Sequence, residues 1–339
     1  MKRFFVTGHQ GYIGAELVRF LKERGDFVTG CDLGLFEGCA FDALVKPDRE
    51  LNKDIRSLTP DDLQGHDVCI HLAAISNDPM GNLDRTITEE VNYEGSLHVA
   101  NTAKSAGVQR FIFAGSCSVY GQGAHLDLDE NAPFNPITAY ASSKIAAERA
   151  ILSMQAPDFC PVSMRNATAY GSSAMLRLDL VVNNLLAAAY TTGKVLVKSD
   201  GTPWRPLIHC RDIALASIAF AEADAAQVSG EAVNVGANCE NYQVKEVAAL
   251  VKKALPDSEI IYTGETGPDP RNYRVNFDKL GALLPHFSLS YTLERGIEEL
   301  LSDFQRSAFT AAAFENGRFI RLNVLKNRLE MLSSVSMRT

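Results

Sequence analysis

The chain has 339 residues, of which 46% are hydrophobic and 22% charged, and its formal net charge is −8. These values are typical of a globular enzyme of about two domains, and the acidic balance argues against a nucleic-acid partner. No apolar run approaches the roughly 20 residues that span a bilayer, so no membrane partner is expected. Seven scattered cysteines without a CxxC pair predict a cytoplasmic protein without disulfides, structural zinc or another metal site.

Strand-like and helix-like segments alternate through the first half of the chain. Runs such as CIHLAA are apolar almost throughout, as strands covered on both faces are. Because strands that alternate with helices pair in parallel through right-handed crossovers, we predict an α/β fold with a Rossmann-like, doubly wound parallel sheet. The expected elements are, in chain order, a strand at 3–8, a helix at 14–25, strands at 26–33 and 67–74, a helix at 89–107 and a strand at 110–116.

The alternation becomes looser in the second half. Residues 177–193 have the pattern of a helix, and residues 194–210 that of a strand, a turn and a strand. We therefore predict an NAD-binding Rossmann domain over residues 1–165 and a smaller C-terminal α/β substrate lobe mainly over 166–305, with some chain returning to the main domain. Residues 306–339 are expected to form a helical tail.

The first strand runs into TGHQGYIG, which spaces Gly8, Gly11 and Gly14 three apart at the start of a helix. Glycines there allow a tight turn, close approach of the backbone to a pyrophosphate and close packing of the helix on the strand, and the helix N-terminus offers free amides to phosphates. Asp32 ends the second strand, eighteen residues after Gly14. A carboxylate there accepts hydrogen bonds from ribose hydroxyls and repels a 2′-phosphate, so the pattern predicts NAD rather than NADP.

The segment YASSK places Tyr140 four residues before Lys144, so both side chains share one face of a helix. Alone, this spacing is also that of an ordinary helix surface. An unperturbed tyrosine, with a pKa of about 10, is a poor base near neutral pH. A nearby ammonium favours the phenolate and lowers that pKa, so the pair is suited to remove a proton from a hydroxyl group.

These motifs resemble those of the extended short-chain dehydrogenase/reductase family, the NAD-dependent nucleotide-sugar epimerases and dehydratases. The resemblance covers roughly residues 3–300, and the order of the motifs makes it more specific than any one of them. Besides GxxGxxG, the matching segments are DI at 54–55, HLAA at 71–74, Asn92, GSCSVYG at 115–121, YASSK at 140–144 and MRNATAYG at 164–171.

The resemblance implies a role for each matching residue. Tyr140 is the expected catalytic base, Lys144 lowers its pKa and holds the nicotinamide ribose, and Ser116 donates a hydrogen bond to the reacting sugar oxygen. The implied cofactor-binding residues are Gly8, Gly11, Tyr12, Ile13, Gly14, Asp32, Asp54, Ile55, Leu72, Ala73, Ala74, Asn92, Tyr140 and Lys144. The implied substrate-binding residues are Ser116, Ser118, Tyr140, Thr168, Asn183, Arg205 and Arg271.

Structural roles stay open for several of these residues. Ser116 is also a possible cap of the strand end, and Ser118 a partner of a nearby backbone group. Asn183 matches the family only weakly, and the alternative for Arg205 and Arg271 is a surface salt bridge.

The residues between Ser116 and Tyr120 narrow the reaction. Family members that eliminate water carry an Asp-Glu pair there, and decarboxylases carry a glutamate at the second position, whereas this chain has Cys117 and Ser118. What remains is oxidation and reduction at one carbon, expected at C4. Because Asp32 disfavours NADP and an epimerase commonly keeps NAD bound, the resemblance favours epimerisation of a nucleotide-diphosphate sugar through a transient 4-keto sugar and bound NAD. Thr168 departs from the asparagine that epimerases of the family usually have.

Two alternatives stay open. The first is an NAD(P)-dependent nucleotide-sugar 4-ketoreductase or dehydrogenase, and the second is a non-catalytic NAD-binding regulator. A homodimer built on a four-helix interface is implied by the resemblance alone.

Overall fold

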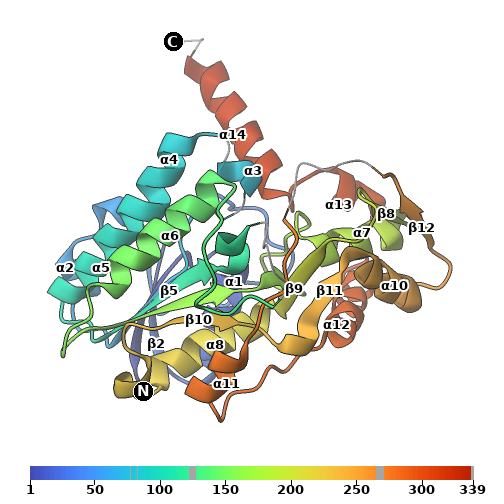
Figure 1. Cartoon of the computed structure of the whole chain (residues 1–339). Helices are drawn as coiled ribbons and strands as arrows, with labels where there is room; N and C mark the ends of the chain where they lie inside the picture. Colours follow the sequence, from blue (N-terminus) through green and yellow to red (C-terminus); the bar gives the residue numbers. More distant parts are fainter. Residues whose placement is uncertain (77, 82, 122–126, 265–270, 337–339) are drawn as a thin grey trace.

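A computed structural model of the chain describes residues 1–76, 78–81, 83–121, 127–264 and 271–336 (Figure 1). Within these residues the main sheet has seven strands in the order β10-β6-β5-β4-β1-β2-β3, and every neighbouring pair is parallel. The order runs outward in both directions from β1 and β4, so the predicted Rossmann-like fold is confirmed. The strands are β1 (Arg3–Thr7), β2 (Phe27–Asp32), β3 (Arg49–Asn52), β4 (Val68–His71), β5 (Arg110–Ser116), β6 (Cys160–Asn166) and β10 (Ala232–Val235).

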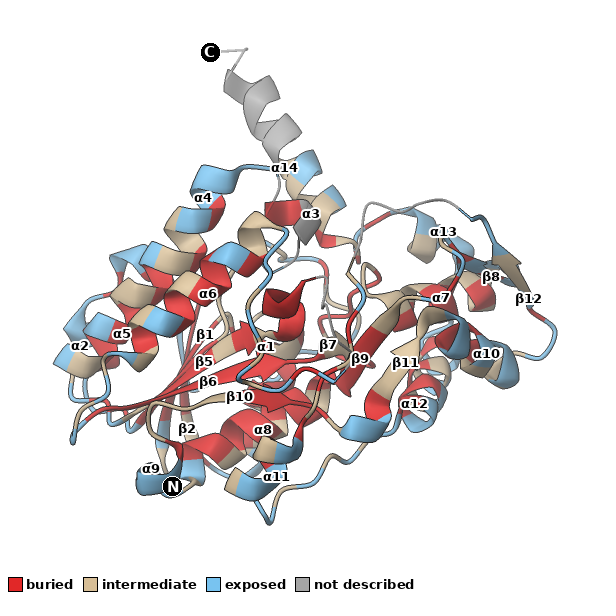
Figure 2. Ribbon diagram, viewed as in Figure 1, coloured by how far each residue is buried: buried red, intermediate tan, exposed pale blue. Residues whose placement is uncertain are grey.

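Helices cover both faces of this sheet. On one face α1 (Tyr12–Glu23) packs against α8 (Cys210–Glu222), and on the other α5 (Ser96–Ser105) packs against α6 (Ala139–Leu152). The central strands are buried almost along their whole length (Figure 2), which explains their nearly continuous apolar sequences. The second face also carries α2 (Pro60–Leu63) and α4 (Arg85–Glu89), with a π-turn (Glu90–Gly95) joining α4 to α5.

A smaller lobe lies beside the carboxyl ends of the main strands (Figure 1). Its strands β8 and β9 are the two expected within residues 194–210, but they do not pair with each other. Instead β8 pairs with β12, whereas β9 pairs with β7 and β11, so this segment connects two small sheets. The strands are β7 (Thr168–Tyr170), β8 (Lys194–Val197), β9 (Trp204–His209), β11 (Asn241–Gln243) and β12 (Glu259–Tyr262).

The remaining helices are distributed over both lobes and the C-terminal tail. Among the described residues, no helix combines the length and apolar character needed to cross a bilayer. These helices are α3 (Asp78–Gly81), α7 (Val181–Thr192), α9 (Ala225–Val228), α10 (Val244–Ala254), α11 (Asp278–Leu283), α12 (Leu293–Arg306), α13 (Ala311–Glu315) and α14 (Arg321–Ser336).

Two predicted helices have different starts. The helix expected at 14–25 begins at Tyr12, so Gly14 lies inside its first turn. The helix expected at 177–193 begins only at Val181. The residues before it are held in an irregular conformation, because the Arg177 side chain turns to Asp179 and the Asn183 amide donates to the Arg177 carbonyl oxygen (2.9 Å).

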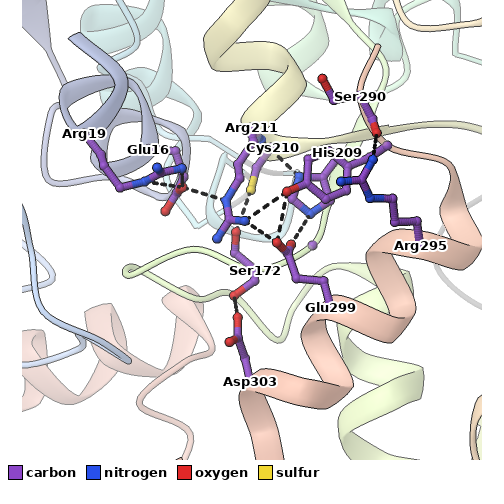
Figure 3. Close-up of polar contacts among 12 residues, drawn as sticks. Glu16, Arg19, Ser172, His209, Cys210, Arg211, Ser290, Arg295, Glu299 and Asp303 are labelled. Carbon is purple, nitrogen blue, oxygen red and sulfur yellow. Dashed lines mark hydrogen bonds and ion pairs between the residues drawn. The ribbon is translucent and has the colours of Figure 1, made fainter. Parts of the chain in front are cut away.

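A polar network joins the two lobes (Figure 3). Glu16, on α1, accepts hydrogen bonds from Arg19 (2.9 Å) and from Arg211 of α8 (2.8 Å). Arg211 also pairs with Glu299 of α12. A buried carboxylate with two guanidinium partners is well compensated, so Glu16 fixes the position of α1 relative to the smaller lobe.

We expect Glu16→Gln to lower the unfolding free energy by about 2 kcal/mol, because Arg211 and Arg19 lose their shared carboxylate in a mostly buried site. The measurement is urea denaturation of the cofactor-free protein. Glu23→Gln is the matched control: Glu23 lies on the same helix and also pairs with Arg19, but its side chain is 57% exposed, against 4% for Glu16. The unfolding free energy of Glu23→Gln should fall by less than about 0.5 kcal/mol. Equal decreases in the two variants would contradict this role of Glu16.

Candidate active site

The glycine turn between β1 and α1 lies against the end of β4. Gly8 has a φ of +72°, and a Cβ added there would lie 2.7 Å from the backbone nitrogen of Ala73. A Cβ on Gly14 would lie 2.1 Å from the carbonyl oxygen of Gly8. Gly11 caps the N-terminus of α1. A compact turn with free helix amides is what a dinucleotide diphosphate requires, so the residues present fit NAD.

Asp32 ends β2 beside this turn. Its carboxylate oxygens accept hydrogen bonds from the backbone nitrogens of Gln10 (3.2 Å) and Gly34 (3.0 Å). The segment after β4 lies at the same edge, because the backbone nitrogens of Leu72 and Ala73 donate to Thr7 (3.1 and 3.3 Å). The carboxyl ends of β1, β2 and β4 therefore form one edge that carries most of the predicted cofactor residues. Ala74 lies at the same edge, because it follows Ala73 directly in the chain.

Three of the predicted cofactor residues have structural partners. Asp54 caps the short helix Ile55–Ser57 and pairs with Arg56 (2.8 Å), and Ile55 is buried in the core. Asn92 is fully buried, and its amide donates to the carbonyl oxygen of Ile75 (3.1 Å) and accepts from its backbone nitrogen (2.8 Å). Asn92 thus positions the segment after β4, and the direct cofactor contacts of these residues stay predictions.

Tyr140 lies in the first turn of α6, which Thr138 caps by accepting from the backbone nitrogen of Ala141 (3.1 Å). The Lys144 ammonium lies 5.9 Å from the centre of the Tyr140 ring and donates to the carbonyl oxygen of Ala114 on β5 (2.8 Å). Burial lowers the pKa of Lys144 to about 7. Lys144 therefore connects Tyr140 to the strand whose last residue is Ser116.

The short helix that follows β5, Cys117–Tyr120, contains no carboxylate and no histidine. Ser116 Oγ accepts from the backbone nitrogen of Ser118 (3.1 Å), so Ser116 does cap the turn. Cys117 is buried, its Sγ donates to the carbonyl oxygen of Arg165 (3.1 Å), and burial raises the pKa of its thiol. The hydroxyl of Ser118 is buried and has no hydrogen-bond partner in the described chain, so it does not satisfy a backbone group there.

The smaller lobe brings two predicted arginines together. The guanidinium of Arg205, on β9, donates to the carbonyl oxygens of Trp204 (2.8 Å) and Arg271. Thr168 is half-buried on β7, where it pairs with Leu207.

Asn183 is fully buried, and its side chain is occupied by the protein. It accepts from the backbone nitrogen of Gly171 (2.8 Å) and donates to the carbonyl oxygen of Arg177 (2.9 Å) and to the Tyr12 hydroxyl (3.2 Å). These bonds support the structural alternative, in which Asn183 shapes the turn after β7. Its substrate contact stays a prediction.

Sequence reasoning missed Arg177, which is buried beside the predicted site. Its guanidinium pairs with Asp179 (2.7 Å), donates to Ser76 (3.3 Å), and interacts electrostatically with both Tyr12 and Tyr140. The one signal in the sequence is a lone arginine, followed two residues later by an aspartate, within an apolar segment. Among the described residues no cluster of three or more His, Cys, Asp or Glu side chains could hold a metal ion.

Residues 4–236 match the NAD dependent epimerase/dehydratase family. The chain belongs to this family. It is 25% identical to the dTDP-D-glucose 4,6-dehydratase of Mus musculus over 83% of both chains, and 26% identical to a putative UDP-glucose 4-epimerase of Methanocaldococcus jannaschii over 88% of this chain and 96% of that protein. The structure of MoeE5 in complex with UDP-glucose and NAD matches with a TM-score of 0.77 and 25% identity, over 90% of this chain and 99% of that chain.

Membership of the NAD dependent epimerase/dehydratase family confirms the predicted resemblance and NAD as the cofactor. The protein is an enzyme of a family whose members include both nucleotide-sugar epimerases and dehydratases. The family alone therefore does not decide between these reactions.

We expect Asp32→Asn to weaken NAD binding and strengthen NADP binding, because it removes the charge that attracts ribose hydroxyls and repels a 2′-phosphate. The ratio of the two dissociation constants, measured by calorimetry, should change about tenfold or more. Glu50→Gln is the control, since Glu50 is an acid on the neighbouring strand β3 and pairs with His9 (3.0 Å). An unchanged ratio, or the same change in both variants, would remove Asp32 from cofactor selection.

The pKa of Lys144 predicts a pH-dependent stability. Between its folded-state pKa of about 7 and its unfolded value of about 10.4, the unfolded chain binds more protons than the folded chain. The unfolding free energy of the cofactor-free wild type should therefore rise with pH in this window, by at most about 1.4 kcal/mol per unit from this group. Lys144→Met lacks this contribution, so its stability relative to wild type should be greatest below pH 7 and fall as the pH rises.

Urea denaturation at several pH values between 6 and 10 measures this difference. Lys104→Met is the control. Lys104 lies at the end of α5, and its ammonium also donates to a backbone carbonyl oxygen, that of Met154 (2.9 Å). Parallel pH curves for wild type and Lys144→Met would contradict the prediction.

Proposed function

We propose that this protein is an NAD-dependent nucleotide-sugar epimerase that inverts C4 of its substrate through a transient 4-keto sugar. The observation that carries the proposal is the placement of Tyr140 and Lys144 beside β5, whose end lies at the same edge of the sheet as the glycine turn. Bound NAD supplies a reversible hydride acceptor. Tyr140 removes the proton of the C4 hydroxyl, and Ser116 donates a hydrogen bond to the same oxygen.

Lys144 prepares Tyr140 for this step. Its charged form favours the phenolate over the phenol, and its hydrogen bond to the carbonyl oxygen of Ala114 (2.8 Å) fixes the ammonium beside the ring. Because the same tyrosine returns the proton when the keto group is reduced again, one group acts as base and then as acid. No further acid or base is needed for epimerisation.

Elimination of water does need such groups, and the turn after β5 lacks them. Cys117 is buried with a raised thiol pKa, and Ser118 offers only a hydroxyl. This argues against the dehydratase reaction that the name of the mouse relative gives. It favours a reaction confined to oxidation and reduction at one carbon.

Arg205 and Arg271 are proposed to hold the substrate through its nucleotide diphosphate. The Arg205 guanidinium donates to the backbone carbonyl oxygen of Arg271, so both residues belong to one part of the smaller lobe. Guanidinium groups suit a diphosphate because they bind phosphate oxygens bidentately. The relatives are named for UDP- and dTDP-sugars, and we extend only this substrate class to the protein. The homodimer and the cytoplasmic location stay predictions.

The test is a panel of UDP-, dTDP-, GDP- and CDP-sugars with products read by NMR. An epimerase yields the C4 epimer without net formation of NADH, and a substrate deuterated at C4 keeps its label. Accumulation of NADH indicates a dehydrogenase, consumption of added NADPH a ketoreductase, and loss of water a dehydratase. Tightly bound NAD without turnover of any sugar indicates a regulator.

Tyr140→Phe should retain NAD but lower turnover about 10³-fold, because the proton of the sugar hydroxyl loses its acceptor. Tyr93→Phe is the control, since Tyr93 is half-buried in the neighbouring π-turn and packs on the core under α5. Turnover of Tyr140→Phe near that of wild type would remove Tyr140 from the mechanism.

A further inference from the structure

The C-terminal tail packs on the loop that follows Asp32. The ring of Phe41, in that loop, contacts Phe304, Phe309 and Phe319 at centroid distances of 6.1, 6.2 and 5.9 Å, and Arg306 pairs with Asp42 (2.8 Å). Figure 1 shows α14 starting between the two lobes beside α3. The tail therefore reaches the edge of the sheet that carries the cofactor residues.

Arg321, the first residue of α14, is buried with an incomplete set of partners. It is 2% exposed, its Nη2 donates to the carbonyl oxygens of Met175 (2.9 Å) and Leu176 (3.4 Å), and its guanidinium stacks on Phe36. Its Nη1 is buried without a hydrogen-bond partner in the described chain. Since buried donors are nearly always satisfied, this nitrogen indicates an acceptor other than the described residues of the chain.

The charges around Arg321 indicate that this acceptor is an anion. Arg177 follows directly after the two carbonyls that Arg321 binds, and it is also buried. Within the described residues, Asp179 is the carboxylate that pairs with Arg177, and Arg321 forms no ion pair. Two guanidinium groups thus share one carboxylate, and burial together with the charge of Arg177 lowers the pKa of Arg321 to about 10. An uncompensated buried charge is costly unless a ligand neutralises it.

This cluster lies beside the first turn of α1. The Ser173 hydroxyl donates to the carbonyl oxygen of Tyr12 (2.8 Å), and the Tyr12 hydroxyl donates to that of Gly171 (2.7 Å). Met175 packs against Ala15 of the same turn. Because Arg321 binds the Met175 and Leu176 carbonyl oxygens and Arg177 follows directly, both arginines belong to the segment that packs on this first turn.

We propose that Arg321 and Arg177 form a diphosphate-binding pair, to which the C-terminal tail contributes one guanidinium group. The shared ligand chemistry is a diphosphate, either that of NAD or that of the nucleotide sugar, and only the second source rests on the proposed function. Arg321 offers its Nη1 donor to a phosphate oxygen. Arg177, whose donors are bonded to Asp179 and Ser76, contributes its positive charge.

Arg321→Met removes the charge and keeps an unbranched side chain to cover Phe36. Calorimetric titration of cofactor-depleted protein with NAD is the first arm, and titration of NAD-loaded protein with UDP, dTDP, GDP and CDP is the second. If the pair holds the cofactor, the NAD dissociation constant rises about tenfold to a hundredfold and the nucleotide diphosphate constants stay unchanged. If the pair holds the substrate, the nucleotide diphosphate constants rise and the NAD constant stays unchanged. If no nucleotide diphosphate binds the wild type, the NAD titration alone tests the proposal.

Arg318→Met is the control, because Arg318 is exposed three residues earlier and stacks on Phe319; both arms should keep wild-type values. Arg321→Lys keeps the charge but loses the fork, so a smaller loss is expected, and this variant carries the test if Arg321→Met does not fold. Unchanged binding in both arms would overturn the proposal and leave water as the acceptor of Nη1. Equal weakening by Arg318→Met would overturn it as well, because the effect would then be one of general charge.

Discussion

The first turns of α1 are bonded to both lobes, and the relative position of the lobes depends on these bonds. Tyr12 is bonded to Gly171 and Ser173, at 2.7 and 2.8 Å, by its hydroxyl and its carbonyl oxygen. One helical turn further, Glu16 bonds Arg211 (2.8 Å), which also pairs with Glu299 of the smaller lobe. A shift between the lobes would leave buried polar groups without partners, which is costly. The phosphate-binding turn and the residues of the smaller lobe are therefore fixed relative to each other.

The contacts between the lobes also bring buried positive charges to the region where the ligands are expected. The chain as a whole carries a net charge of −8, yet Lys144, Arg177 and Arg321 are buried. Lys144 lies beside Tyr140, and the two arginines belong to the segment that packs on the first turn of α1. Interactions between charges are stronger at such buried positions than at the surface. The diphosphate of NAD and that of the proposed nucleotide-sugar substrate are both anionic, so a site that binds them would need such an excess of buried positive charge.

The parts of the site that the sequence predicts are those whose requirements are local. Gly8 and Gly14 are needed by one tight turn, Asp32 by one strand end, and Tyr140 with Lys144 by one helical turn, so neighbouring residues reveal them. The remaining parts depend on contacts between distant segments. β10 joins the main sheet from the second half of the chain, and Arg321 meets Met175 across 146 residues. The roles of Asn92 and Asn183 could not be predicted for a different reason. A side-chain amide can bond a ligand or the backbone, and only the structure shows which partners it has.

The packing of the tail on the loop after Asp32 bears on how fast the cofactor can exchange, and so on the kind of reaction proposed. The loop after Asp32 is anchored by Phe41, which contacts Phe304 of α12 and Phe309 and Phe319 of the tail, and by the Arg306–Asp42 pair (2.8 Å). Opening that loop would expose a large aromatic area to water, and each buried ring covers about 150–250 Å². A cofactor whose adenosine half lies under the loop would therefore exchange slowly. Slow exchange is a disadvantage for a reductase, which must renew its cofactor in every cycle, but it suits an epimerase, which returns the hydride before any ligand leaves.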